Sequence, residues 1–229
     1  MKTSRLSQLR NRLAAQDGMS IMELIVGIMV TSIVLAIVGS MFVNVAKITS
    51  NSNATTTRTS TAANVMNEIS TVIRPAVNNP IAGSDDADPA IVSGTALALT
   101  IYSFVDASPA APAPTKVAFR IDAQGNVVED RWTAVASGAF WVFTGTVFTR
   151  TLGGPVQNPA GTDPLFVYLD DLGAVLTPGT SGLTLAQRGA VASVRVTVNI
   201  ANQPTTGSDP IVVVNTFGMP NLRASRVDN

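Results

Sequence analysis

Residues 19–43 read MSIMELIVGIMVTSIVLAIVGSMFV, and Glu23 is their only charged side chain. At a helical rise of about 1.5 Å per residue, this run reaches about 37 Å and exceeds the ~30 Å hydrocarbon core of a bilayer. A secretory signal peptide has a shorter apolar core, of about 7–15 residues, followed by a small-residue cleavage site. No A-x-A sequence follows this run. The stretch therefore predicts a membrane-spanning helix.

A basic segment precedes this apolar run. Residues 1–18 carry four basic side chains against the single acidic Asp17; the basic ones are Lys2, Arg5, Arg10 and Arg12. Basic residues that flank a membrane span tend to remain in the cytoplasm. The sequence thus predicts a cytoplasmic N-terminus and an exported body.

Helical spacing continues beyond residue 43. Apolar residues three and four positions apart mark one helical face, and they are Val65, Met66, Ile69, Val72 and Ile73. The intervening Thr49–Thr61 is rich in poor helix formers, so a break there would give two helices. Pro75 is the first proline of the chain and a natural terminator. We favour one long helix that ends at about Arg74.

The pattern after Pro75 is typical of β-structure. Short runs rich in Val, Thr and Phe predict strands at Thr95–Val105, Lys116–Ile121, Asn126–Trp132, Phe140–Phe148, Leu165–Leu169, Val191–Ile200 and Ile211–Phe217. Gly125 and Gly173 stand where turns need a positive φ. The predicted fold is α+β: a long N-terminal helix, membrane-spanning and then amphipathic, packed on a C-terminal antiparallel β-sheet domain. The predicted segments are a leader (1–18), an apolar helix (19–43), an amphipathic continuation (44–74) and a β-rich extracytoplasmic domain (75–229).

Composition excludes several kinds of chemistry. The 229 residues include no His and no Cys, which rules out a Ser-His-Asp triad, an imidazole-ligated metal, a thiolate nucleophile and a disulfide. We therefore expect no enzymatic activity and no cofactor, and an anchored enzyme with a carboxylate site is the least favoured alternative. After residue 18 the chain has 11 basic and 14 acidic side chains, a balance that argues against nucleic-acid binding.

Two side-chain groups have alternative interpretations. Asp85, Asp86 and Asp88 could bind a cation, but they lack EF-hand spacing, and a solvated loop is favoured. The aromatic group of Phe140, Trp141, Phe143 and Phe148 could be a binding stripe, although strand spacing favours a place in the core.

The junction between the basic and apolar segments reads DGMSIMEL over residues 17–24. A basic leader ends at Gly18, Met19 opens the apolar run, and Glu23 follows four residues later. This arrangement resembles the class III signal of type IV pilins and type II secretion pseudopilins. The resemblance implies that a prepilin peptidase cleaves after Gly18, that Met19 becomes the N-methylated N-terminus, and that Glu23 is the assembly glutamate. Met19 stands where the family most often has Phe.

The chemistry of Glu23 supports this interpretation separately. A carboxylate within an apolar helix costs about 2.5–3.5 kcal/mol near the bilayer centre and usually has a partner. No basic side chain lies within two helical turns of Glu23 along the sequence. After cleavage, the amine of Met19 could pair with Glu23 of its own chain or of a neighbour. Alternatively, Glu23 could simply snorkel to the cytoplasmic interface.

Two parts of the body resemble the larger minor pilins of the PilW and PulJ type, namely Val117–Trp132 and Leu165–Pro178. The resemblance implies a structural minor subunit of a type IV pilus. Its partners would be other pilin subunits, the prepilin peptidase, the inner-membrane assembly platform and, before assembly, membrane lipid. The alternatives are a major pilin, a secretion or competence pseudopilin and, from another class, an uncleaved single-pass protein whose β-domain binds a ligand.

Overall fold

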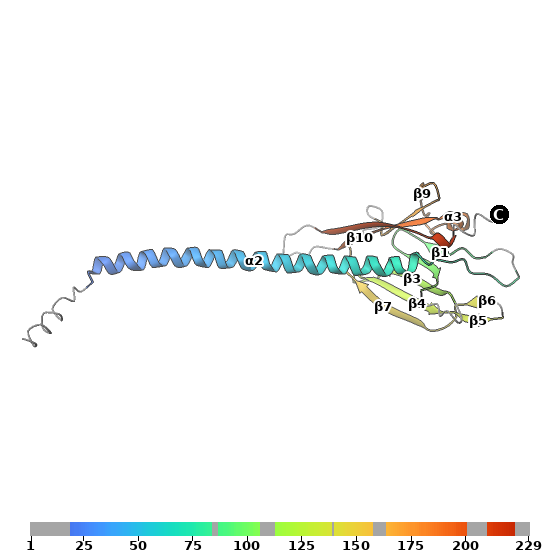
Figure 1. Cartoon of the computed structure of the whole chain (residues 1–229), viewed down its shortest axis with the longest axis horizontal. Coiled ribbons are helices and arrows are strands. Elements are labelled where there is room, and N and C mark those ends of the chain that lie inside the picture. Colours follow the sequence, from blue (N-terminus) through green and yellow to red (C-terminus); the bar gives the residue numbers. More distant parts are fainter. Residues whose placement is uncertain are drawn as a thin grey trace, which may run out of the picture. The chain divides into compact units, whose positions relative to one another are not determined.

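A computed structural model describes residues 19–83, 87–105, 113–138, 140–157, 164–200 and 210–222. The chain forms two compact units, Met1–Ser52 and Asn53–Asn229, and helix α2 (Ile21–Ile73) passes from the first into the second (Figure 1). The prediction of one uninterrupted helix ending next to Arg74 is confirmed. The leader with Gly18, and also Asp85 and Asp86, lie outside the described residues.

The first unit is described over residues 19–52, and α2 is apolar on every side up to Val43. Every Val, Ile, Leu, Met and Phe between Met19 and Ile48 is at least 48% exposed. The hydroxyls of Thr31 and Ser32 each donate to a carbonyl four residues earlier, both at 2.7 Å, so they present little polar surface. Among the described residues, α2 is the one helix long and apolar enough to cross a membrane.

The Thr-rich segment stays helical, and its hydroxyls bond to the helix backbone. Thr49 donates to the carbonyl of Val45 at 2.9 Å, and Thr59 and Thr61 donate to carbonyls four residues earlier at 2.9 and 3.0 Å. Such bonds satisfy a hydroxyl without opening the helical ladder. This stretch therefore joins the apolar and amphipathic parts of α2 without a break.

The last part of α2 supplies one wall of the hydrophobic core of the second unit. All five apolar residues expected on its inner face are buried, together with Ala62. They belong to one cluster with residues of two sheets, including Leu99, Ile101, Val117 and Phe119 from one sheet and Phe166, Tyr168, Val194, Val196 and Val198 from the other. The α+β prediction is thereby confirmed: an N-terminal helix packs on antiparallel β-sheet.

The described residues form two sheets and a separate hairpin, and each of their strand pairs is antiparallel. The five-stranded sheet has the order β1 (Ile91–Gly94), β2 (Leu99–Ser103), β3 (Thr115–Ile121), β4 (Val127–Thr133) and β7 (Val147–Gly153). The four-stranded sheet has the order β11 (Ile211–Gly218), β10 (Ser193–Ile200), β8 (Phe166–Leu169) and β9 (Val175–Leu176). Strands β5 (Val135–Ser137) and β6 (Phe140–Val142) form the hairpin, and α3 (Leu185–Ala190) is a short helix.

The predicted strand Phe140–Phe148 is wrong as a single element. Strand β6 ends at Val142 and β7 begins at Val147, with Gly145 in the bend between them. The core position favoured for the aromatic group is also wrong, because Phe148 is 63% exposed and the other three are half-buried. The β5–β6 hairpin pairs with neither main sheet. Strands β1, β5 and β9 and helix α3 had no predicted counterpart.

Both predicted glycine turns form as expected. Gly125 and Gly173 each have φ of +82°. In each turn an aspartate side chain accepts two backbone N–H groups, Asp122 at 2.9 and 2.8 Å and Asp170 at 3.0 and 2.7 Å. The backbone hydrogen bonds that Asp122 accepts, chiefly from Asn126, lower its pKa.

Candidate functional site at the start of the apolar helix

Helix α2 begins with a partly formed cap at Ser20. The Ser20 hydroxyl accepts the Met22 N–H at 3.3 Å, and its carbonyl accepts the Leu24 N–H at 3.0 Å. Glu23 therefore lies in the first helical turn, where a negative charge gains about 0.3–1 kcal/mol from the helix dipole. The signal for this was present in the sequence as the S-x-x-E pattern of a capping box, and it gives Glu23 a local role at the start of the helix.

The two described site residues share one stretch of helix surface. Met19 and Glu23 border a shallow depression with Leu24, Gly27, Ile28, Thr31 and Ser32. A side-chain carbon added at Gly27 would meet no atom within 4 Å, so the depression is open there. Gly18, the third predicted site residue, lies outside the described residues.

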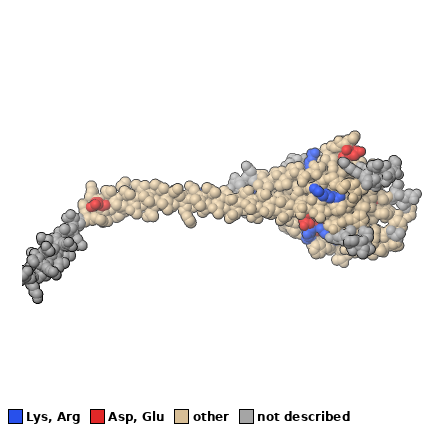
Figure 2. Space-filling model, viewed as in Figure 1, with Lys and Arg blue, Asp and Glu red and all other residues tan. Residues whose placement is uncertain are grey.

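Glu23 makes no ion pair or hydrogen bond within the part of the chain that the structure describes. The first basic residue after it in the sequence is Lys47. At about 1.5 Å per residue, Lys47 lies roughly 36 Å further along the helix. Figure 2 shows an acidic patch near the start of α2 and then a long uncharged surface. A helix that is apolar on every side and carries one carboxylate at its start is suited to contact with lipid or with other helices.

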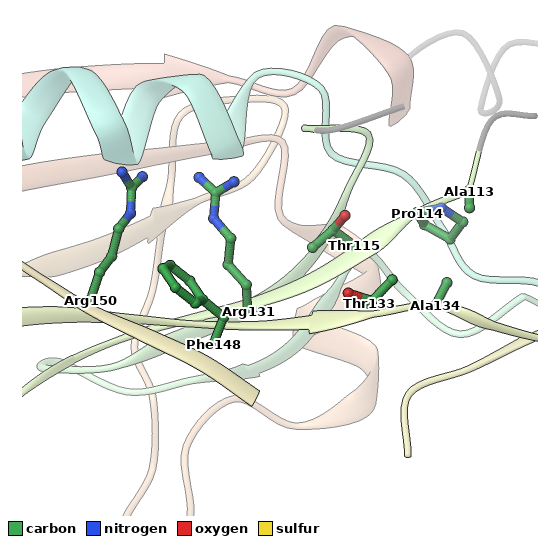
Figure 3. A pocket seen from close by; sticks show the side chains of 8 residues that line it. All are labelled: Ala113, Pro114, Thr115, Arg131, Thr133, Ala134, Phe148 and Arg150. Atoms are coloured by element: carbon green, nitrogen blue, oxygen red, sulfur yellow. The ribbon is translucent and has the colours of Figure 1, made fainter. Parts of the chain in front are cut away.

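A second charged arrangement was not predicted, and it joins α2 to the five-stranded sheet. Glu129 on β4 is fully buried, and its carboxylate accepts from Arg131 Nε at 2.9 Å and from Arg150 of β7. Arg150 also bonds to Glu68 of α2, whose carboxylate lies 4.0 Å from Arg131. Figure 3 shows both arginines directed from the strands toward the helix. The alternation of Glu129 and Arg131 on one strand face was the available signal.

Two glutamates balance two arginines in this cluster. A pocket of about 450 Å³ beside it is lined by Arg131, Phe148 and Arg150, among others. Burial lowers the pKa of Arg150, but the hydrogen bonds and charges of Glu129 and Glu68 outweigh it and raise that pKa overall. Because the charges are already compensated, we interpret the cluster as a structural ion-pair network that holds the helix on the sheet.

The one described residue of the aspartate group is also engaged. The Asp88 carboxylate accepts from the Tyr102 hydroxyl at 3.2 Å and lies 3.8 Å from Arg188. Burial and the charge of Asp88 raise the pKa of Tyr102 to about 12. Within the described ranges, no group of three or more acidic side chains could hold a metal ion. Asp88 thus fastens the start of the β-domain to α3.

No protein-family model matches the chain, and no curated protein sequence matches it.

Proposed function

We propose that the protein is a structural subunit of a membrane-derived filament of the type IV pilus class, most like a minor pilin. One observation carries this proposal. The helix that forms the core of the folded domain continues for about 30 residues with apolar side chains exposed on every side and one unpaired carboxylate at its start. Such a helix needs an apolar environment that the described part of this chain does not supply.

In this proposal the subunit exists in two states, one before and one after filament assembly. Before assembly, residues 19–43 span the inner membrane with the N-terminus in the cytoplasm, and prepilin peptidase cleaves after Gly18. After assembly, the same helix packs against the helices of other pilin subunits in the filament core, and the β-domain faces the cell exterior. The partners are therefore those other subunits, the peptidase, the assembly platform and, before assembly, lipid.

Glu23 has a physical role in this proposal. Cleavage would leave a positively charged amine at Met19, beside the positive end of the helix dipole, where a cation is unfavourable. Glu23 in the first turn offsets that charge, either within its own chain or on a neighbour. Pairing with a neighbour would also fix the axial register of packed helices.

The test is the assembly of glutamate variants in the native host. We expect Glu23→Gln and Glu23→Ala to be processed and found in membranes, but to be strongly depleted from sheared filaments. Ser40→Ala, on the same helix, removes only a hydroxyl bonded at 2.8 Å to the carbonyl of Ile37 and should enter filaments normally. Normal incorporation of both Glu23 variants would contradict the assembly role. Complete absence of the wild-type chain from filaments would favour an anchored binding protein.

A further inference from the structure

Strand β11 forms one edge of the four-stranded sheet, and it is a long, regular strand. All eight of its residues pair with β10 without a shift in register, and no other strand pairs with β11 within the described residues. Its sequence, IVVVNTFG, contains no charged residue.

The hydrogen bonds of β10 define which groups of β11 point away from the sheet. Thr197 donates its backbone N–H to Leu165, so the odd-numbered residues of β10 face β8 and the even-numbered ones face β11. In an antiparallel ladder, opposed residues bond in pairs at every second position. Ile211, Val213, Asn215 and Phe217 therefore bond to β10, and Val212, Val214 and Thr216 direct their N–H and C=O groups outward.

The free part of this edge is short and well defined. At one end Pro210 has no N–H. At the other end the Thr216 N–H donates to the side chain of Asn215 at 2.8 Å. Between them, no hydrogen bond within the described residues uses the outward groups of Val212 and Val214, whose side chains are 53% and 55% exposed. Among the described residues, two donors and two acceptors of this edge therefore have no partner, and the valine side chains beside them are apolar.

The other sheet edges carry the features that usually prevent strand addition. Strand β9 is only two residues long, β1 has an irregular register between Ile91 and Ser93, and β7 carries Arg150. Short length, bulges and charges are the common ways in which proteins protect an edge. Strand β11 has none of these three features at Ile211–Val214. It is therefore the edge strand best able to accept an added strand.

We propose that the β11 edge is a docking site for an extended, uncharged segment of another protein chain, which adds to the sheet as an antiparallel strand. Only another backbone offers donors and acceptors at the two-residue spacing of Val212 and Val214. Valine at both positions, opposite Thr197 and Asn199 on the outer face, favours uncharged β-branched side chains in the added segment.

A second copy of this chain is a less suitable occupant. Antiparallel pairing of two β11 strands would turn the Asn53–Ile73 parts of the two helices in opposite directions, because β10 runs along this part of α2 (Figure 1). Chains anchored by the preceding residues in one membrane would point the same way. This preference for a different chain rests on the proposed function, whereas the open edge itself does not.

The test uses a defined peptide and the full chain in detergent micelles. The probe is a fluorescent, end-blocked peptide SVTVTVNI, which is the β10 sequence with Thr replacing its Arg. We expect saturable binding by fluorescence anisotropy, and at least a tenfold loss with Val214→Pro, which removes an outward N–H that bonds to nothing in the sheet. Val214→Lys should give a similar loss. Its matched control is Val175→Lys on β9, because the two valines are 55% and 56% exposed.

Asn215→Ala should strengthen binding severalfold, because it frees the Thr216 N–H as a third donor. Thermal unfolding verifies that each variant is folded, and Val214→Lys keeps the test valid if the proline variant is not. Equal binding by both Val214 variants and wild type, or no binding of the probe to wild type, would overturn the proposal. Self-association that Val214→Lys abolishes would replace the proposed occupant with a second copy. The assay does not involve Glu23, so its outcome is independent of the filament test.

Discussion

Residues 19–48 and residues 62–73 of α2 carry similar apolar side chains but bury them to opposite extents. Ile37 in the first stretch is 54% exposed, whereas Ile69 in the second is fully buried. The second stretch is amphipathic and its inner face is covered by two sheets of the same chain. The first is apolar on every side and nothing in the described structure covers it. The two stretches of this one helix therefore have different surroundings, and the described part of the chain covers only the second.

The difference between the two stretches can be expressed as the free energy of burial that residues 19–48 do not gain within the described structure. Burial of one Val, Leu, Ile or Met side chain contributes about 1.5–3 kcal/mol. Nineteen such large apolar side chains between Met19 and Ile48 are exposed. Their burial would together contribute far more than the 5–15 kcal/mol by which folded domains are typically stable, and leaving them in water forgoes that gain. Lipid, or the helices of other subunits as proposed above, would supply this missing cover.

The strongest test of this contrast places two arginines in each half of α2. Leu35→Arg with Val38→Arg should cost about 5–7 kcal/mol, twice the single-residue cost of about 2.5–3.5 kcal/mol in a bilayer. The matched control is Asn64→Arg with Asn67→Arg, which has the same spacing on an exposed part of the amphipathic half. Carbonate extraction of membranes should release the first variant and retain the second. Retention of both would mean that the apolar half is not what anchors the chain in the membrane.

Substitutions in the ion-pair network between α2 and the sheet should give the next largest effect, a loss of unfolding free energy. Glu129→Gln leaves Arg131 and Arg150 with only Glu68, and we expect a loss of about 3 kcal/mol, the lower end for a broken buried pair. The lower value applies because the arginine side chains are 18% and 35% exposed. Glu68→Gln, at a site 34% exposed, should cost less than about 1 kcal/mol. Denaturant unfolding of the β-domain measures both, and equal losses would contradict the assigned importance of Glu129.

Removal of a single methyl group should affect the stability of the domain in one half of α2 and not in the other. Ile69→Val should destabilise the domain by about 0.5–1.5 kcal/mol. At about 2–4 °C per kcal/mol for a domain of this size, the melting temperature should fall by a few degrees. Ile37→Val should leave that melting temperature unchanged, because Ile37 takes no part in the domain core. A shift with Ile37→Val would show that the two stretches share one core.

A fall in pH should have the smallest effect on stability. It acts through Asp130, on the outer face of the five-stranded sheet. Burial raises the pKa of Asp130, but hydrogen bonds from Arg120 and Thr149 and the Arg120 charge outweigh it and lower that pKa overall. The contribution of Asp130 is therefore complete above its unfolded pKa of about 3.9 and is lost as the pH falls through its lower folded value. Asp130→Asn should flatten the fall in unfolding midpoint below about pH 4. An unchanged pH profile would contradict this assignment.

Periodicity was sufficient to predict the helix and most of the strands. The inner face of α2, from Val65 to Ile73, followed from residues at three- and four-residue spacing, and VRVTVNI indicated β10 by strict alternation. These predictions worked because burial on one side imposes a pattern along the chain. The turns at Gly125 and Gly173 followed from local backbone chemistry.

Features that depend on tertiary contacts were not predictable in this way. The bend at Gly145 divides an aromatic run that looks continuous in sequence, and Phe148 then lies on an exposed edge strand. The pairing of Glu129 with Arg150 depends on the register of β4 and β7, which no local pattern specifies. At the candidate site, Glu23 was identified from its spacing to Gly18 and Met19 and from its isolation among apolar residues, whereas the hydrogen bond that Ser20 accepts at the helix start came from the structure.

The most direct measurement is mass spectrometry of the mature N-terminus, from membranes and from sheared filaments of the native host. The account predicts a chain that begins at N-methylated Met19 in both fractions, because a filament subunit must lose residues 1–18 before its apolar helix can pack. A chain that keeps residues 1–18 and occurs only in membranes would contradict the filament proposal. The apolar half of α2 would then serve as a permanent membrane anchor.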